Sequence, residues 1–243
     1  MSHGFFATIF YIPLYNALVW LIDILPGHPA WVAVVLLTVI IRFVLYPLSK
    51  SSIKTQILMK QIEPEIQKIR EKITDKAEQG RKTLELYRSK GINPFAGFLL
   101  LLIQLPIVFG LYKVFSSGLP KIDTTLLYSF VAVPESVAMS FFGLDLASAP
   151  LRIVLAILAV ITQFIQINLA LPKVTRKEGG TFQNDLAYSM NMQMRYILPL
   201  IMFPIAYISA VIALYLITTN IFMTAQEIFV KRRMERQLNA TNK

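Results

Sequence analysis

The sequence predicts an all-α polytopic membrane protein, and three observations support this prediction. The 243-residue chain is 55% hydrophobic and 16% charged, with a mean hydropathy of +0.57, a composition typical of chains that bury much of their surface in lipid. Several apolar runs are long enough to cross a hydrocarbon core of roughly 30 Å. Lys and Arg cluster between these runs. We expect five transmembrane helices, N-terminus outside and C-terminus inside, with an N-terminal interfacial amphipathic helix and a cytoplasmic helical hairpin.

The N-terminal region, residues 1–29, contains an apolar segment with a polar stripe. Asn16 and Asp23 fall broadly on one side of a helix, and Pro13 lies within it. This pattern favours an amphipathic helix lying in the membrane interface, although a further span is an alternative that the residues leave open. No basic region precedes the segment, so we do not expect a cleaved signal peptide. The run Pro26-Gly27-His28-Pro29 ends the helix.

The next apolar segment, residues 31–48, has one arginine, Arg42, inside it. The segment covers about 27 Å as a helix, close to the thickness of the hydrocarbon core. An arginine at that depth costs between about 3 and 10 kcal/mol. It therefore either faces protein or water, or extends its side chain to the interface by snorkelling. Thr38 lies one turn earlier on the same face, so the helix presents a short polar stripe.

The chain becomes strongly charged after Pro47. Residues 49–93 carry isoleucines at spacings of three and four, which is typical of a helix with one apolar face. Asp75 and Glu78 fit a helix N-cap followed by a capping box. We therefore expect two helices that meet near residues 73–76 and form a cytoplasmic hairpin. Its charges serve either as a solvated face or as a docking surface for a cytosolic partner.

Two further apolar segments are expected to span the membrane. Residues 95–115 contain Gln104, and residues 151–171 contain Gln163 and Gln166 in their inner half. Amide side chains within lipid need hydrogen-bond partners, so these glutamines are expected to face other helices.

The last apolar segment, residues 195–231, is too long for one span. As a single helix it would measure about 52 Å. A single span would also export the basic C-terminal tail, whereas two spans return it to the inner side. We therefore divide the segment near residues 207–210. Thr218, Thr219 and Asn220 give the last span a polar patch.

The distribution of positive charge sets the predicted topology. Residues 49–94 contain eleven Lys and Arg, residues 173–195 contain four and the segment after residue 230 contains five, whereas residues 1–30 contain none. This asymmetry follows the positive-inside rule, which explains the net charge of +10 without nucleic acid. The outer connection, residues 116–150, is expected to hold at most short interfacial helices.

The sequence does not favour an enzyme. It contains no HExxH, G-x-S-x-G, P-loop or G-x-G-x-x-G motif. The two histidines, His3 and His28, lie in the N-terminal region, and cysteine is absent. Asp and Glu are confined to loops and to the ends of the predicted spans, so the paired intramembrane carboxylates expected of a proton or sodium transporter are missing. We therefore expect no catalytic residues, no metal site and no cofactor.

Several stretches resemble the YidC/Oxa1/Alb3 family of membrane protein insertases. The resemblance covers most of residues 12–230 and is strongest through the first helix, the hairpin and the second helix. The resemblance is looser at the end, where Ser209 to Leu216 lack the family's Pro, Gly and aromatic pattern. Phe98 stands where the family often has Cys. The matching stretches are IIRFVLYPLSKSSIKTQ, QIEPEIQKIREK, LYRSKGINPFAGFLLLLIQLPIVFGLYKV, ITQFIQ and LYLITTNIFMTAQE.

This resemblance implies a five-helix core with a hydrophilic groove that opens to the cytoplasm and to lipid. In such a groove Arg42 would receive the polar, often acidic, outer segment of an incoming chain. The large folded outer domain and the lipoprotein cysteine of some members are absent, so a minimal bacterial form in the plasma membrane is expected. The core would comprise residues 30–230, followed by a basic cytoplasmic tail, 231–243. The candidate groove residues are Arg42, Thr38, Gln104, Gln163, Gln166, Tyr215 and Asn220.

The resemblance also implies partners. These are nascent membrane proteins, the lipid bilayer, the ribosome through the basic tail and cytoplasmic loops, and in some settings the Sec translocon. No specific nucleic acid is expected. The alternative is a small polytopic transporter that binds an anionic solute at Arg42. That class predicts internal repeats with broken helices in matching positions, which the sequence does not show.

Overall fold

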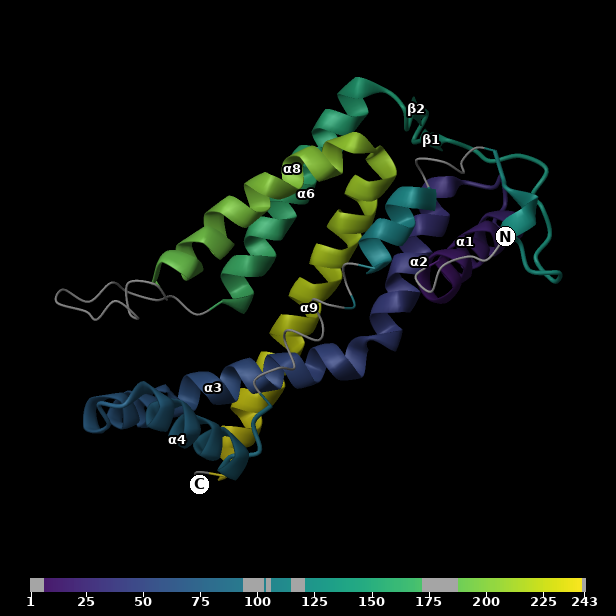
Figure 1. Ribbon diagram of the computed structural model, residues 1–243. Coiled ribbons are helices and arrows are strands. Elements are labelled where there is room, and N and C mark those ends of the chain that lie inside the picture. Colours follow the sequence, from purple (N-terminus) through teal and green to yellow (C-terminus); the bar gives the residue numbers. More distant parts are fainter. Residues whose placement is uncertain (1–6, 94–102, 104–105, 115–120, 172–187, 242–243) are drawn as a thin grey trace. The chain divides into compact units, whose positions relative to one another are not determined.

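The computed structural model describes residues 7–93, 103, 106–114, 121–171 and 188–241 (Figure 1). The chain divides into two compact units. The first unit comprises residues 1–44 and 104–224, and the second comprises residues 45–103 and 225–243. The elements of the first unit are η1 (Ala7–Tyr11), α1 (Ile12–Ile24), α2 (Ala30–Val44), η2 (Thr124–Leu126), β1 (Ser140–Phe141), β2 (Leu144–Asp145), α6 (Ala149–Ala170), η3 (Gln193–Ile197), α8 (Leu198–Ile208) and the first part of α9 (Ala210–Thr241).

Helix α1 packs against α2 through an apolar core. Tyr15, Leu18 and Ile22 of α1 and Val34 of α2 are fully buried. The predicted break between the two helices is confirmed, because α1 ends at Ile24 and α2 begins at Ala30. The apolar stretch that contains α1 is shorter than a full span, so the choice between an interfacial and a spanning position stays a prediction.

Helix α2 ends earlier than the sequence predicts. The expected helix ran to residue 48, but α2 stops at Val44 and a new helix, α3 (Tyr46–Lys72), begins after Leu45. Pro47 explains the break. Its nitrogen carries no N–H to donate and its ring clashes with the carbonyl four residues earlier, so Pro47 is best accommodated in the first turn of a new helix, where it lies.

The second unit contains the predicted hairpin, made of α3 and α4 (Lys76–Ser89). Ile62 and Ile66 of α3 and Ile92 after α4 form its buried cluster. Tyr87 packs against this cluster, and burial, with a smaller contribution from the Glu63 carboxylate, raises the pKa of its phenol. The hairpin therefore has a small apolar core of its own, although α4 contains no fully buried residue.

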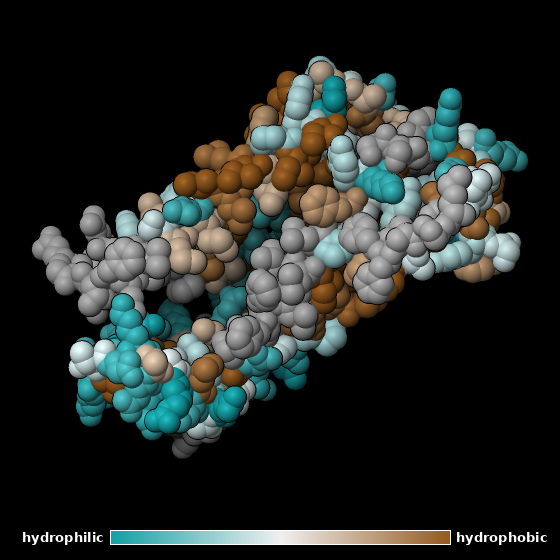
Figure 2. Space-filling model, viewed as in Figure 1, coloured by the Kyte–Doolittle hydropathy of each residue, from teal (hydrophilic) through white to brown (hydrophobic). Residues whose placement is uncertain are grey.

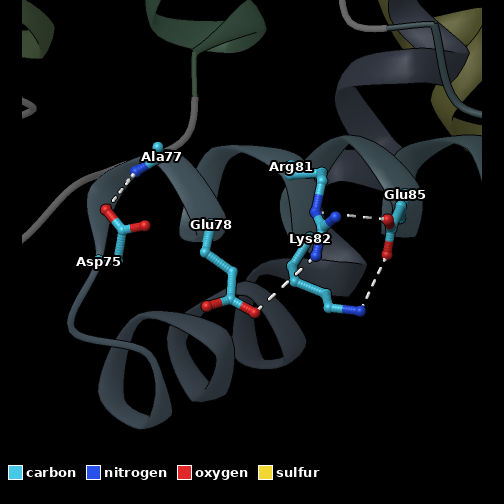
Figure 3. Close-up of polar contacts among 6 residues, drawn as sticks. All are labelled: Asp75, Ala77, Glu78, Arg81, Lys82 and Glu85. Carbon is cyan, nitrogen blue, oxygen red and sulfur yellow. Dashed lines mark hydrogen bonds and ion pairs between the residues drawn. The ribbon is translucent and has the colours of Figure 1, made fainter.

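The turn of the hairpin carries the predicted N-cap (Figure 3). Asp75 accepts a hydrogen bond from the backbone N–H of Ala77 at 3.1 Å, which satisfies one of the first donors of α4. Glu78, which a capping box would turn back toward Asp75, lies 3.9 Å from Arg81. Exposed ion pairs of this kind contribute between about 0 and 1 kcal/mol each, so the apolar cluster and the cap contribute most to the hairpin's stability.

The connection between residues 121 and 148 contains a β-hairpin, which the sequence analysis did not predict. Strands β1 and β2 pair antiparallel, with Ser140 opposite Asp145 and Phe141 opposite Leu144. The all-α prediction therefore holds for the body of the chain but not for these few residues. The strands are too short for an alternating pattern to be recognised in the sequence.

Two side chains of α1 hold the start of this connection. The Asn16 side chain donates to the carbonyl of Leu126 at 2.8 Å and accepts from the N–H of Tyr128 at 2.6 Å. The Tyr15 hydroxyl accepts from the N–H of Asp123 at 2.7 Å. The polar stripe that suggested an interfacial helix thus binds the backbone of a neighbouring loop and supplies hydrogen-bond partners to its N–H and C=O groups.

The last apolar segment is divided where the sequence predicts. Helix α8 ends at Ile208, Ser209 is extended with φ −150° and ψ 132°, and α9 begins at Ala210. Helix α6 packs along α8. Among the described helices, α6 and the stretch Ala210–Met234 of α9 are each long and apolar enough to cross a membrane, and α2 with α3 makes a third candidate if counted as one broken span. The space-filling view shows hydrophobic residues gathered over α6 and α8 and hydrophilic residues over α3 and α4 (Figure 2).

We predict that Asn16→Ala loosens the connection at Tyr128. Two part-buried backbone groups would lose a hydrogen-bond partner, and the loss of such a partner costs up to about 1 to 3 kcal/mol when the group stays shielded from water. Amide exchange at Tyr128 should therefore accelerate by roughly tenfold or more. Ser129→Ala, a change at an exposed neighbouring residue, serves as the control. Unchanged exchange at Tyr128 in the Asn16 variant would show that the loop is held by other contacts.

Candidate functional site

Arg42 lies in the last turn of α2 and is 2% exposed. Its Nη2 donates to the Thr219 hydroxyl of α9 at 3.4 Å, and its guanidinium also hydrogen-bonds with the Tyr215 side chain. Tyr215 and Thr219 are four residues apart on α9, so both hydroxyls lie on the same face of that helix. The first unit thus brings a cation from α2 together with two neutral hydroxyls from α9.

The direction of the Arg42 side chain separates two interpretations of the sequence. A snorkelling arginine would extend along its own helix and keep its head group exposed. The guanidinium instead reaches across to α9 and is buried. Phe43 and Phe222 stack edge to face at 5.1 Å beside it, so a second contact joins the same two helices. The geometry therefore favours a buried polar position for this charge.

Thr38 shares the buried face of α2 with Arg42, as the sequence predicts. It is 1% exposed, and its hydroxyl donates to the Val34 carbonyl at 2.7 Å. This bond uses its hydrogen within the helix, whereas its oxygen lone pairs can still accept. Thr38 therefore adds polarity to this face of α2.

Asn220 holds α9 to α6. Its Nδ2 lies 3.3 Å from the carbonyl oxygen of Ala159 and 3.1 Å from the hydroxyl of Thr162. Asn220 is 3% exposed, so this amide is a buried bridge between two helices. Asn220 was predicted to line the groove with Arg42, but its described contacts are with α6, whereas the neighbouring Thr219 contacts Arg42.

The structure describes two of the three candidate glutamines. Gln166 of α6 is buried and Gln163 is half-buried, so the C-terminal half of α6 carries polar side chains of different exposure. Gln104 lies outside the residues that the structure describes. The structure thus brings Tyr215 to Arg42 and places Thr38 one turn away on α2. The other described candidates lie on or against α6; they are Asn220, Gln163 and Gln166.

A second buried arginine, Arg195, was not among the predicted site residues. It is 5% exposed and donates to the Asn168 side chain at 2.7 Å and to the Leu171 carbonyl at 3.2 Å. These acceptors lie at the C-terminal end of α6, where the helix dipole favours a cation. In the sequence Arg195 marks only the edge of an apolar run. The one hint of a hydrogen-bond partner for it is Asn168, which lies in the amide-rich stretch with Gln163 and Gln166. We assign Arg195 a positioning role for the end of α6.

The site is suited to binding rather than to covalent chemistry. Its described residues offer a guanidinium, hydroxyls and amides. Within the residues that the structure describes, no group of three or more His, Cys, Asp or Glu is placed to hold a metal ion. A guanidinium with neutral neighbours attracts carboxylates and other anions, because its field is screened less in a buried site than in water.

Comparison with known proteins gives a consistent result. The family model described as "60Kd inner membrane protein" matches residues 22–237. The chain is 32% identical over 233 residues to the membrane protein insertase YidC of Clostridium tetani, covering 96% of this chain and 95% of that protein. It is 30% identical over 204 residues to the protein of the same name from Fusobacterium nucleatum, covering 83% of this chain and 86% of the relative.

A third relative, the membrane protein insertase YidC of Oceanobacillus iheyensis, is 29% identical over 243 residues, which cover 96% of this chain and 86% of that protein. All three relatives are named for membrane protein insertion. The family match spans both α2 with its buried arginine and the facing residues of α9. The chain therefore belongs to the YidC/Oxa1/Alb3 family of membrane protein insertases and is a multi-pass protein of a bacterial membrane.

Proposed function

We propose that this protein inserts nascent membrane proteins by receiving the hydrophilic outer segment of a substrate at Arg42 and releasing its transmembrane helix into the bilayer. The observation that carries the proposal is the buried guanidinium between α2 and α9 in a chain of the insertase family. The proposed groove opens to the cytoplasm and to lipid. It acts by shortening the apolar barrier for a polar segment, so the protein itself performs no catalysis.

The strength of the proposed attraction follows from the surroundings of Arg42. Two unit charges 4 Å apart attract by about 1 kcal/mol in water and by about 4 kcal/mol at an effective dielectric constant of 20. The described hydrogen-bond partners Thr219 and Tyr215 are neutral and therefore leave the charge of Arg42 in place. A substrate carboxylate that approaches this site gains the larger attraction, which offsets part of the cost of removing it from water.

The neutral polar residues have a secondary role in this proposal. Thr38 and Tyr215 lie beside Arg42, and Gln163, Gln166 and Asn220 carry polar groups on or against α6. We propose that they and Gln104 hydrate the groove rather than bind charge. Single substitutions of these residues are then expected to be milder than those of Arg42.

The membrane topology proposed for this function has five spans, with the N-terminus outside and the C-terminus inside. The charge distribution supports it, since the hairpin and the tail hold most of the Lys and Arg. Residues 188–208 are helical without interruption and end where α9 begins, as two consecutive spans require. We further propose that α1 lies in the outer interface.

The cytoplasmic partners are proposed from charge. The tail after residue 230 continues α9 as a helix to Thr241 and carries Lys and Arg, which would suit an RNA-rich ribosomal surface without base recognition. The exposed charges of α3 and α4 offer a second contact for the ribosome or, during shared insertion, for the Sec translocon. Both contacts serve delivery of the substrate rather than its release.

We predict opposite accessibility for two single-cysteine variants, which the cysteine-free chain makes simple to prepare. Ser136 lies in the exposed outer connection and Ser89 at the exposed end of α4. An impermeant maleimide applied to intact cells should label Ser136→Cys and should label Ser89→Cys only after lysis. Labelling of Ser89→Cys in intact cells would contradict the proposed topology.

We predict that the effect of changing Arg42 depends on the charge of the substrate. Arg42→Lys should keep partial activity, because the charge remains while the bidentate guanidinium is lost. Arg42→Ala should reduce insertion of a substrate with an acidic outer segment by about tenfold or more, because at least about 1.4 kcal/mol of attraction is removed. A matched substrate with a neutral outer segment should be affected less.

Insertion into proteoliposomes would be measured for both substrates, with Lys121→Ala, a change at an exposed cation of the outer connection, as the control variant. A snorkelling arginine would tolerate alanine for both substrates. Equal loss for the acidic and the neutral substrate would argue against electrostatic reception and for a purely structural role of Arg42.

A further inference from the structure

The β-hairpin of residues 140–145 has one apolar and one polar face. Phe141 lies opposite Leu144, and Ser140 lies opposite Asp145. Because successive side chains of a strand point to opposite faces, Phe141 and Leu144 share one face and Ser140 and Asp145 share the other. Leu144 is 57% exposed, so the apolar face is not covered by the rest of the unit.

The turn of this hairpin contains an unexpected residue. Phe142 and Gly143 connect the strands, with φ of 47° and 85°. A two-residue turn with positive φ at both positions favours Asn followed by Gly, because a bulky side chain is strained in this conformation. Phe142 is nevertheless 79% exposed. The Phe142 ring contacts the rings of Trp31 and Phe141, yet most of its surface stays exposed, and the turn itself does not favour an aromatic residue.

The apolar face is mounted on the start of α2. The N–H of Ala30 donates to the Ala138 carbonyl at 3.1 Å, and the N–H of Ala138 donates to the His28 carbonyl at 3.0 Å. The Trp31 ring lies 5.2 Å from the Phe141 ring and 5.3 Å from the Phe142 ring. These contacts place three aromatic rings together at the N-terminal end of an apolar helix.

We propose that the aromatic tip of this hairpin, formed by Phe142 and Leu144 on the support of Trp31 and Phe141, inserts into the boundary between the head groups and acyl chains of the lipid leaflet. The proposal rests on the membrane setting of the proposed function but not on insertion activity. Two observations select lipid as the occupant. First, the tip is uncharged, and Asp145 lies on the other face of the hairpin. Second, the tip contacts Trp31 at the N-terminal end of α2, and aromatic residues at the ends of membrane helices favour the interface.

This anchor would set the depth of Arg42. Arg42 lies eleven positions after Trp31, which corresponds to about 16 Å along α2. If the tip holds Trp31 at the edge of a hydrocarbon core roughly 30 Å thick, Arg42 lies near the middle of the bilayer. The hairpin would thus hold the charge at the depth where a polar segment of a substrate meets the largest barrier.

Spin labels at two positions of the hairpin test the proposal. Phe142→Cys and Ser140→Cys, each labelled with a nitroxide in the full chain, would be placed in vesicles of phosphatidylcholine and phosphatidylglycerol without any other protein. Accessibility to oxygen, which concentrates in lipid, is compared with accessibility to a water-soluble nickel chelate. The ratio of oxygen to nickel accessibility should be several-fold higher at position 142 than at position 140, its matched control on the polar face.

A water-like ratio at both positions would overturn the proposal, because no lipid would then contact the tip. Dipolar broadening between labels at position 142 would also overturn it, since a second copy of the chain would then cover the tip. No substrate is present in these measurements. A loss of insertion activity would therefore leave the result intact, and a negative result here would leave the role of Arg42 untouched.

Phe142→Asn separates anchoring from folding of the hairpin. Asn suits the positive φ of this position, so the turn should persist or become more stable. Protection of the Leu146 amide, which donates to the Met139 carbonyl at 2.9 Å, reports that the hairpin is intact. A label at Leu144→Cys should then lose most of its excess of oxygen over nickel accessibility when Phe142→Asn is added. Full retention of that excess would show that Phe142 is not the anchor.

Discussion

The burial of one guanidinium constrains the part of the molecule on which the proposed function depends. An arginine inside apolar helices needs polar partners close by, because desolvation of its charge costs several kcal/mol. The described partners of Arg42 come from one face of α9, where Tyr215 and Thr219 replace the apolar residues that a lipid-facing helix would carry. Asn220, one residue further, holds the same helix to α6. A short polar stretch of α9 therefore links the charged helix to the rest of the unit.

The parts of the fold that sequence reasoning predicted are those with strong local signals. Proline and glycine mark the end of α1, Asp75 caps α4, and excess length divides the last apolar segment at Ser209. One error arose because hydropathy was given more weight than a local proline signal, and the other because the deciding contact is not local. The span around Arg42 was drawn through Pro47 on hydropathy alone, although the ring of that proline ends α2 at Val44. The β-hairpin depends on backbone pairing with the start of α2, which no short pattern reveals.

The site was predictable as a set of polar residues in apolar segments but not as a set of contacts. Arg42 could be identified because a charge in a membrane helix is rare and costly. Which neighbour faces it could not be read from the sequence. Thr219 and Asn220 are adjacent polar residues of α9, yet the first contacts Arg42 and the second contacts α6, since adjacent helical positions differ by about 100° in direction. Arg195 was not predicted to be a buried, hydrogen-bonded residue, because its acceptors lie in α6 and at its C-terminal end, far away in the sequence.

The early end of α2 has an electrostatic consequence for the arginine. A helix terminus carries about half a negative charge on its last carbonyls, and Arg42 lies within the last turn that ends at Val44. The interruption at Leu45 thus places a fixed partial negative charge within one helical turn of the Arg42 backbone without using an acidic side chain. A carboxylate there would neutralise the site and compete with an anionic guest. Carbonyl dipoles instead lower the cost of holding the cation without neutralising it, so in the proposed function the early end of α2 would help to keep the site positively charged.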